Sequence, residues 1–267
     1  MGVIITLTTD FGLNDAYVAA MKGVILGINP EATLVDICHT IKPQNILEAA
    51  FILSTAYPFF PDKTIHVVVV DPGVGTERRA VLLKTPTACF LAPDNGVLSY
   101  VLADYSASSK ELPPALQAVA ITKPEFWRSP ISSTFHGRDI FAPVAAHLSL
   151  GLSATKFGEV ITSLTTLPLA KPYREADGSL VGHIIHIDSF GNLSTNIRSP
   201  DLAKTGKEIT IEVGNRVIRG LSRTYAEGEQ LLALIGSSDY LEVSLKEGSA
   251  HASLKVNVGD KVKIRTG

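Results

Sequence analysis

The sequence predicts an α/β domain followed by a smaller antiparallel β domain. Over the first 150 residues, apolar β-branched runs alternate with stretches of helical spacing, which is typical of a mainly parallel central sheet flanked by helices. Beyond residue 165 the apolar runs become short and turn signals become frequent, which indicates a small barrel or sandwich. A polar segment rich in Pro and Lys separates these two regions of the sequence, so we expect domains at residues 1–168 and 169–267.

Three apolar runs predict the buried strands of the first domain, at residues 3–9, 33–37 and 64–70. The stretch after the first run has apolar residues at helical spacing and ends before Pro30, so it predicts a helix. We expect the buried face of this helix to contain Tyr17, Val18, Met21, Val24, Ile25 and Ile28.

Three further helices are expected in the same domain. One covers about residues 44–57, and a shorter one follows Asp94. The last covers about residues 138–150 and is followed by a glycine, which favours a helix end. The stretch from 103 to 133 is rich in Pro and Ser and predicts an irregular connection.

Composition excludes several classes of protein. The 267 residues include 24 Lys and Arg against 26 Asp and Glu, and the formal net charge of −2 offers no basic surplus for a nucleic-acid partner. The purest apolar run, residues 65–70, is too short to cross a membrane, and no secretory signal is recognised at the amino terminus, so we expect a cytoplasmic protein without a membrane partner. Cys38 and Cys89 lack CxxC spacing, so neither a disulfide framework nor a bound metal is expected.

The strongest candidate for chemistry begins where the third apolar run ends. Residues 67–79 read V-V-V-V-D-P-G-V-G-T-E-R-R and place Asp71 and two arginines in a glycine-bearing turn. In an open parallel sheet, ligands bind at the carboxyl ends of the strands. The alternative is an ordinary surface ion pair between Asp71 and Arg78 or Arg79. The two glycines lack the third glycine of a dinucleotide-binding fingerprint.

Two other polar clusters lie at the ends of predicted elements. Residues 132–139 read S-S-T-F-H-G-R-D just before a predicted helix. Helix capping explains the hydroxyl groups but not the histidine and arginine between them, so capping and function are equally supported. Asp10 follows the first strand in T-T-D-F-G, and two acidic residues at one sheet edge, Asp10 and Asp71, are placed to converge on one ligand.

The second domain carries weaker signals. Residues 188–192 read D-S-F-G-N and by themselves indicate a hairpin turn, as do the turn residues in 236–242 and 247–250. His183 and His186 are three residues apart on a predicted strand. They therefore point to opposite faces and do not predict a metal site.

Five motifs, in one order along the chain, carry a resemblance to a known family. They are T-D-F-G at 9–12, D-P-G-V-G-T-E-R at 71–78, F-H-G-R-D at 135–139, D-S-F-G-N at 188–192 and S-S-D-Y-L-E at 237–242. Together they resemble the S-adenosyl-L-methionine (SAM) hydroxide adenosyltransferases and, more distantly, the fluorinases and chlorinases. The resemblance spans nearly the entire chain.

The resemblance implies a homotrimer with active sites at subunit interfaces. The α/β domain of one subunit and the carboxyl-terminal antiparallel β-barrel of its neighbour would enclose SAM, which is the substrate and not a cofactor. It also implies that Asp71, Arg78 and His136 handle water. Arg78 is chosen over Arg79 because the family arginine lies seven residues after the aspartate.

The resemblance also implies substrate contacts in both domains. Asp10 matches the carboxylate that binds the ribose hydroxyls, and Phe190 with Asn192 matches the adenine contacts. The loop between Asp188 and Phe190 is one residue shorter than in the halogenases. Contacts to the amino-acid end or to the base are expected near Asp188, Ser237, Glu242 and Ala250.

The implied reaction requires an activated water. The sulfonium of SAM makes C5′ electrophilic and methionine leaves as a neutral thioether, so the leaving group needs no general acid. We hypothesise that Asp71 and His136 hold the water and accept its proton, while Arg78 stabilises the developing hydroxide and keeps Asp71 ionised. Attack by an anion on a cation cancels charge and is favoured in an apolar pocket, for which Phe135 and Phe190 are candidate walls.

Two alternatives to hydrolysis remain open. A halogenase attacks the same carbon with halide, but a fluorinase-like sequence has Tyr-Ser where this chain has His136-Gly137. An imidazole beside a charged Asp–Arg pair suits water better than halide. A non-catalytic sensor would bind SAM or adenosine without turnover.

Overall fold

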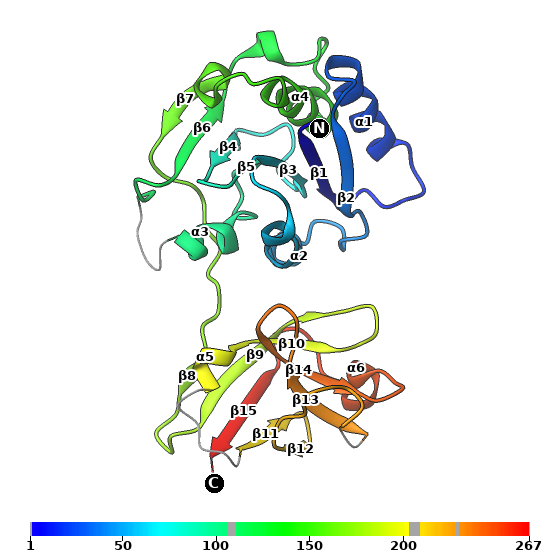
Figure 1. The fold of residues 1–267 in the computed structure, drawn as a ribbon, viewed down its shortest axis with the longest axis vertical. Coiled ribbons are helices and arrows are strands. Elements are labelled where there is room, and N and C mark those ends of the chain that lie inside the picture. The colour runs from blue at the N-terminus through cyan, green and yellow to red at the C-terminus, as the bar shows by residue number, and fades with distance from the viewer. Residues whose placement is uncertain (1, 106–110, 203–208, 228–229, 267) are drawn as a thin grey trace. The chain divides into compact units, whose positions relative to one another are not determined.

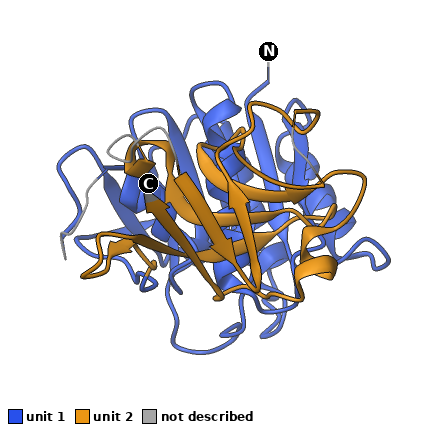
Figure 2. Ribbon diagram, turned by 90° about the horizontal axis from the view of Figure 1, so that it is seen from below, with its two compact units in different colours: residues 1–168 blue, residues 169–267 orange. Residues whose placement is uncertain are grey.

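The computed structural model describes residues 2–105, 111–202, 209–227 and 230–266 (Figure 1). The chain divides into two compact units, residues 1–168 and residues 169–267 (Figure 2). Each unit has its own sheet and its own hydrophobic core. The predicted fold class, an α/β domain followed by an antiparallel β domain, is confirmed.

The first unit is built on a seven-stranded sheet in the order β2-β1-β3-β5-β4-β6-β7. The first four strands in this order are parallel to one another, and β4, β6 and β7 extend the sheet through antiparallel pairings. The strands are β1 (Ile4–Thr9), β2 (Thr33–Cys38), β3 (Thr64–Val69), β4 (Ala80–Lys84), β5 (Ala88–Pro93), β6 (Gln117–Ile121) and β7 (Gly158–Ile161).

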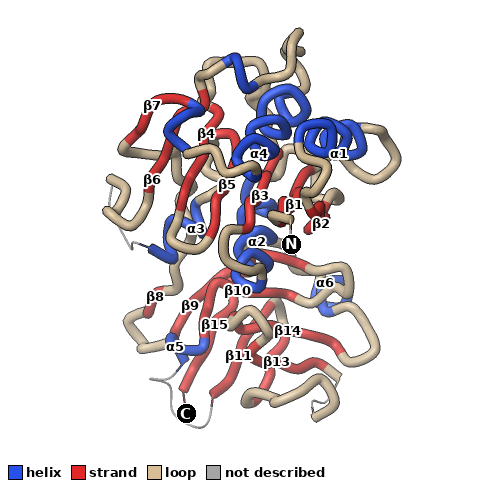
Figure 3. The backbone as a smooth tube through the Cα atoms, turned by 45° about the horizontal axis from the view of Figure 1, so that its top comes forward, coloured by secondary structure: helices blue, strands red, loops and turns tan. Residues whose placement is uncertain are grey.

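Helices cover both faces of this sheet (Figure 1 and Figure 3). Successive side chains of a strand point to opposite faces, so Ile65 and Val67 of β3 pack in the core that includes α1 and α4, while Val68 packs in the core that includes α2 and α3. The helices are α1 (Tyr17–Ile28), α2 (Ile46–Ala56), α3 (Ser99–Tyr105) and α4 (Ala142–Ser149), with short 3₁₀ segments η1 (Tyr57–Phe59), η2 (Pro124–Phe126) and η4 (Ala154–Phe157) and the π-helical segment η3 (Gly137–Phe141).

Two sequence predictions for this unit need correction, and a third is confirmed with a local difference. The irregular connection expected over 103–133 contains β6, because a run of only five apolar-rich residues forms a strand once its neighbours β4 and β7 pair with it. The helix expected at 138–150 is confirmed, except that its first part is the π-helical segment η3, which continues as α4. Tyr17 does not share the buried face of α1; it is half-exposed and borders the cavity described below.

The second unit is an antiparallel sheet whose path runs β12-β11-β15-β9-β10-β14-β13, with β8 paired to β9. The two ends of this path, β12 and β13, contact each other, so the sheet nearly closes into the predicted barrel. The elements are β8 (Tyr173–Arg174), β9 (Leu180–Ile187), β10 (Leu193–Arg198), α5 (Ser199–Leu202), β11 (Ile209–Val213), β12 (Arg216–Arg219), β13 (Leu231–Ile235), β14 (Tyr240–Leu245), α6 (Ala250–Leu254) and β15 (Lys261–Thr266).

The helices of both units are short. Across the described ranges, none combines the length and the hydropathy that crossing a bilayer requires. The longest, α1, has 12 residues.

Candidate active site

A cavity of about 370 Å³ lies at the carboxyl edge of the parallel strands in the first unit. Asp10 follows the end of β1 and Asp71 follows the end of β3, and these strands are neighbours with Thr9 opposite Val69. Both acidic residues line the cavity, as expected from two strand ends at one sheet edge. The loop before α4 adds His136 to the same lining.

Arg78 joins Asp71 to His136. Its Nε donates to both carboxylate oxygens of Asp71 at 3.0 and 2.9 Å, and its Nη2 donates to Oδ2 at 2.5 Å. The same Nη2 donates to Nδ1 of His136 at 2.7 Å. The side chains of Asp71 and Arg78 are only 5% and 11% exposed, so bulk water screens the pair weakly. The structure therefore brings together the three residues that the family resemblance assigns to water.

The contact with Arg78 fixes the protonation of His136. A guanidinium has N–H donors and no acceptor, so Nδ1 is the acceptor and the neutral ring carries its proton on Nε2. Burial and the positive charge of Arg78 lower the pKa of His136 below its ordinary value, while Asp71 and Asp139 act in the opposite direction. In this state the ring offers Nε2–H as a donor. This geometry does not support the expected role of His136 as an acceptor of the proton of water.

The neighbouring Arg79 is directed elsewhere. Its Nε donates to Oδ2 of Asp94 at 2.8 Å, and its side chain is 43% exposed. Of the two arginines in the turn, it is Arg78 that contacts Asp71 and His136, in agreement with the spacing of seven residues in the motif.

Close packing of backbone holds the two loops of this site together. Gly75 has a φ of +77°, and a Cβ at this residue would lie 2.3 Å from the carbonyl oxygen of Ser133. Only a residue without a side chain permits this approach. The turn that carries Asp71 and Arg78 is thereby seated against the loop that carries His136.

Aromatic rings form part of the cavity wall. Phe11, Tyr17 and Phe135 all line the cavity, and their ring centroids lie 5.3 to 5.7 Å apart. The sequence analysis named Phe135 as a candidate pocket wall, but not Phe11 or Tyr17. Phe11 stood inside the T-D-F-G motif, which was the available signal, whereas Tyr17 had the spacing of a core residue. Beside them, Oδ2 of Asp10 accepts the backbone N–H of Gln44 at 2.8 Å.

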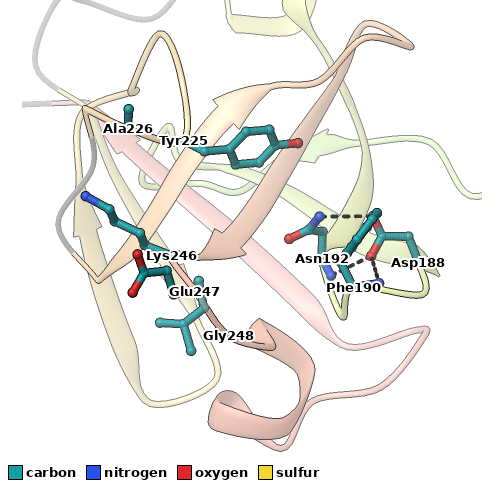
Figure 4. A pocket seen from close by; sticks show the side chains of 9 residues that line it. Asp188, Phe190, Asn192, Tyr225, Ala226, Lys246, Glu247 and Gly248 are labelled. Carbon is teal, nitrogen blue, oxygen red and sulfur yellow. Dashed lines mark hydrogen bonds between the residues drawn. The ribbon is translucent and has the colours of Figure 1, made fainter.

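The second unit has a cavity of about 810 Å³ of its own (Figure 4). Asp188, Phe190 and Asn192 line it together with Tyr225. Oδ1 of Asp188 accepts the backbone N–H groups of Phe190 and Asn192 at 2.9 and 2.8 Å, and Oδ2 accepts the side-chain amide of Asn192 at 3.0 Å. Asp188 thus holds the turn that presents the largely exposed ring of Phe190 and the amide of Asn192 to the cavity.

Tyr225 connects this cavity to a second, smaller one. Its hydroxyl donates to Oε1 of Glu242 at 2.7 Å, and burial together with this bond raises the pKa of Tyr225 to about 12. Glu242 and Ser237 line a hollow of about 40 Å³. Sequence reasoning missed Tyr225, because it lies in a turn-rich stretch outside every recognised motif.

Ala250 borders neither of these two cavities. Its side chain is fully buried in the core of the barrel, at the first position of α6. The preceding Ser249 caps this helix by accepting the backbone N–H of Ala252 at 3.1 Å. A substrate contact at Ala250 would therefore involve its backbone.

No metal centre is evident in the part of the chain that the structure describes. There, no group of three or more His, Cys, Asp or Glu side chains is arranged to hold a metal ion. Cys38 and Cys89 are partly buried free thiols.

Family models match both units of the chain. The model described as the SAM hydroxide adenosyltransferase N-terminal domain matches residues 5–158, and the model of the C-terminal domain matches residues 182–263. The chain belongs to the SAM hydroxide adenosyltransferase family. The resemblance carried by the five motifs is thereby confirmed.

Relatives of this SAM hydroxide adenosyltransferase family member include a hydrolase and a halogenase. A protein named (R)-S-adenosyl-L-methionine hydrolase, from Methanocaldococcus jannaschii, is 35% identical over 98% of this chain and 95% of its own length. A fluorinase from Nocardia brasiliensis is 28% identical over 99% of this chain and 97% of its own length. The crystal structure of an uncharacterized conserved protein from Thermotoga maritima matches with a TM-score of 0.87 and 36% identity, over 97% of this chain and 99% of that one.

Proposed function

We propose that this protein hydrolyses SAM to adenosine and L-methionine by attack of water at C5′. The Asp71–Arg78–His136 cluster carries the proposal, because it places a carboxylate and a neutral imidazole at one cavity. The hydrolase relative at 35% identity, against 28% for the fluorinase, supports water as the nucleophile. We place the reaction in the cytoplasm, where free thiols such as those of Cys38 and Cys89 stay reduced.

The proposed step forms one bond and breaks one. The water oxygen bonds to C5′ while the C5′–S bond breaks, and the electron pair of that bond goes to sulfur. The sulfonium thereby becomes the neutral thioether of methionine. One water proton passes to the carboxylate of Asp71 and then to solvent, so the products are adenosine, methionine and a proton.

Each of the three residues has a distinct part in this step. Nε2–H of His136 donates to the water oxygen, and Asp71 accepts a hydrogen bond and then the proton from the same water. The remaining lone pair of the water is directed at C5′. Arg78 holds both partners, because it binds the carboxylate of Asp71 and requires Nδ1 of His136 to be an acceptor. Catalysis then comes mainly from positioning and electrostatics.

The substrate-binding roles are divided between the two units. In the first, Asp10 accepts hydrogen bonds from the ribose hydroxyls and Phe135 forms an apolar wall. In the second, Phe190 stacks on the adenine and Asn192 hydrogen-bonds to it, with Asp188 holding both in place. The amino-acid end is assigned to Ser237 and Glu242, with a backbone contact at Ala250.

We propose that the two cavities complete one site between subunits of a homotrimer. Co-expression of a His136→Ala chain with a Phe190→Ala/Asn192→Ala chain tests this arrangement, assayed at SAM concentrations far below KM, where each parent protein is nearly inactive. If one subunit supplies each half, about one quarter of the interfaces combine two intact halves and activity returns. If each chain builds its own site, the mixed protein stays inactive.

Product analysis tests the reaction itself. The purified protein is incubated with the (R) and (S) sulfonium epimers of SAM, with and without fluoride, chloride or bromide, and products are separated by chromatography. Because the relative is named for the (R) epimer, we expect that epimer to give adenosine and methionine in equal amounts, with no halogenated nucleoside. A 5′-halo-5′-deoxyadenosine product would identify a halogenase, and tight binding without any product would identify a sensor.

A variant of His136 separates binding from turnover. His136→Ala removes the Nε2–H donor, so we expect turnover to fall by about 100-fold or more while SAM binding persists. Calorimetric binding and steady-state rates measure the two effects separately. Turnover equal to that of the wild type would remove His136 from the mechanism.

A further inference from the structure

Asp139 is a buried charge in the first unit that does not line the cavity. Its exposure is 0%, and within the described ranges it is the only Asp, Glu, Lys or Arg that is fully buried. Burying a carboxylate is costly unless it is paired and hydrogen-bonded. Its partners therefore indicate what the charge does.

The partners of Asp139 all come from the segment that precedes it. Arg138 donates from Nε to Oδ1 at 2.6 Å and from Nη2 to Oδ2 at 2.8 Å. The backbone N–H of Ser132 donates to Oδ2 at 2.8 Å, and that of Arg128 donates to the carbonyl oxygen of Asp139 at 2.8 Å. Burial acts to raise the pKa of Asp139, but the bonds from Arg138 and Ser132 bring it below its ordinary value. Asp139 thus closes residues 128–139 into a loop tied at both ends.

This loop carries one wall of the cavity. Phe135 and His136 line the cavity from within it. The guanidinium of Arg138, fixed by Asp139, lies 5.0 Å from the ring centroid of Phe135. Directly after His136 the chain enters the π-helical segment η3, which contains Asp139, and such segments are frequent at functional sites.

We propose that Asp139 is a positioning residue for SAM hydrolysis, which holds His136 and Phe135 in place through Ser132 and Arg138 without touching substrate. The role presupposes the proposed hydrolysis and extends it to a residue outside the cavity. A displacement of about 1 Å at a reacting group costs about 100-fold in rate. Asp139 also acts through its charge. Arg78 lowers the pKa of His136, whereas Asp71 and Asp139 raise it.

The substitution Asp139→Asn tests this role because it keeps the volume and removes the charge. We expect kcat to fall by about 10- to 100-fold with little change in KM. Loss of the negative charge lowers the pKa of His136 further, and protonated His136 cannot accept from Arg78. The acid limb of the kcat profile should therefore move to lower pH. A purely structural role for Asp139 would not produce that movement.

A second variant keeps the test decisive if Asp139→Asn does not fold. Arg138→Lys keeps the positive charge and the carboxylate but loses the forked pairing. We expect a smaller loss of kcat than in Asp139→Asn and an acid limb at the wild-type position. A folded Arg138→Lys protein with wild-type kcat would overturn the proposal, as would a folded Asp139→Asn protein with wild-type kcat and pH profile.

Asp94→Asn is the matched control. Asp94 also has a shielded carboxylate, with a side chain that is 4% exposed. Its Oδ2 accepts two N–H groups of Arg79, and its Oδ1 accepts the backbone N–H of Thr165. Its partners lie outside the 128–139 loop, so we expect wild-type kcat and pH profile. Equal losses in Asp94→Asn and Asp139→Asn would indicate general destabilisation and overturn the positioning role. If the wild-type protein itself forms no adenosine, the proposed function fails instead.

Discussion

Replacing Arg78 by methionine removes the group that joins the proposed catalytic residues. Methionine fills similar space but donates no hydrogen bond, so Asp71 loses its cation and His136 loses the donor at Nδ1. The side chain of Asp71 is 5% exposed, and removing one partner of a buried ion pair costs about 3 to 5 kcal/mol. For a unit of this size each 1 kcal/mol shifts Tm by about 2 to 4 °C, so we expect the first unit to melt roughly 10 °C lower.

The same substitution changes the pH dependence of activity. Burial is the largest cause that lowers the pKa of His136, and the positive charge of Arg78 is the next. Removing Arg78 therefore lets His136 protonate at higher pH. The acid limb of kcat/KM should therefore move upward. With neither Asp71 nor His136 held in place, kcat/KM at neutral pH should fall by about 100-fold or more.

Arg79→Met is the matched control for this experiment. Arg79 is the next residue, and its partner Asp94 has a side chain that is only 4% exposed, so we expect Arg79→Met also to lower the melting temperature. Its hydrogen bonds go to Asp94 and to the carbonyl oxygen of Ser163, so we expect near-wild-type activity. Scanning calorimetry measures both melting temperatures, and chromatography of adenosine measures the rates across the pH range. The reasoning is refuted if Arg78→Met keeps the wild-type rate and acid limb, or if Arg79→Met loses as much activity.

Three further predictions concern other parts of the chain. Gly75→Ala brings a Cβ 2.3 Å from the carbonyl oxygen of Ser133, so kcat should fall at least about tenfold. Gly151 also has a positive φ but lies in open space, so Gly151→Ala should keep the wild-type kcat. Equal rates for the two variants would contradict the packing argument. Burial lowers the pKa of His66 to about 4, so between pH 6.5 and pH 4 the unfolded chain is protonated at this residue and the folded chain is not. The free energy of unfolding should therefore fall by about 3 kcal/mol as the pH is lowered from 6.5 to 4. In urea titrations, the free energy of unfolding of His66→Phe should depend less on pH than that of the wild type. The same pH dependence in both proteins would exclude His66 as its source. Phe190→Ala removes the exposed ring beside Asn192 and should raise KM for SAM about tenfold with kcat nearly unchanged; a change in kcat alone would place Phe190 outside the binding step.

The parts of the first unit that depend on strand ends were predictable from sequence. A buried β-branched run followed by a carboxylate defines Asp71, and the same pattern defines Asp10. Their convergence follows because β1 and β3 are parallel neighbours. The strands β4 to β7 were not predicted, since short segments become strands only when antiparallel partners pair with them.

Other features depend on contacts between distant residues. Asp139 has the sequence position of an ordinary residue in the first turn of a helix, and its burial becomes apparent only when the loop closes on Ser132. The protonation of His136 follows from a donor 58 residues away, Arg78. Tyr225 reaches its cavity from a turn that has no motif. Sequence patterns identify chemical groups, whereas the roles of these three residues require the folded geometry.

Oxygen labelling is the most direct test of water attack at C5′. The reaction is run in ¹⁸O-labelled water, and adenosine and methionine are analysed by mass spectrometry. We expect a single heavy oxygen in adenosine, located on its 5′-hydroxyl, and none in methionine. Unlabelled adenosine, or label carried by methionine, would contradict the proposed displacement.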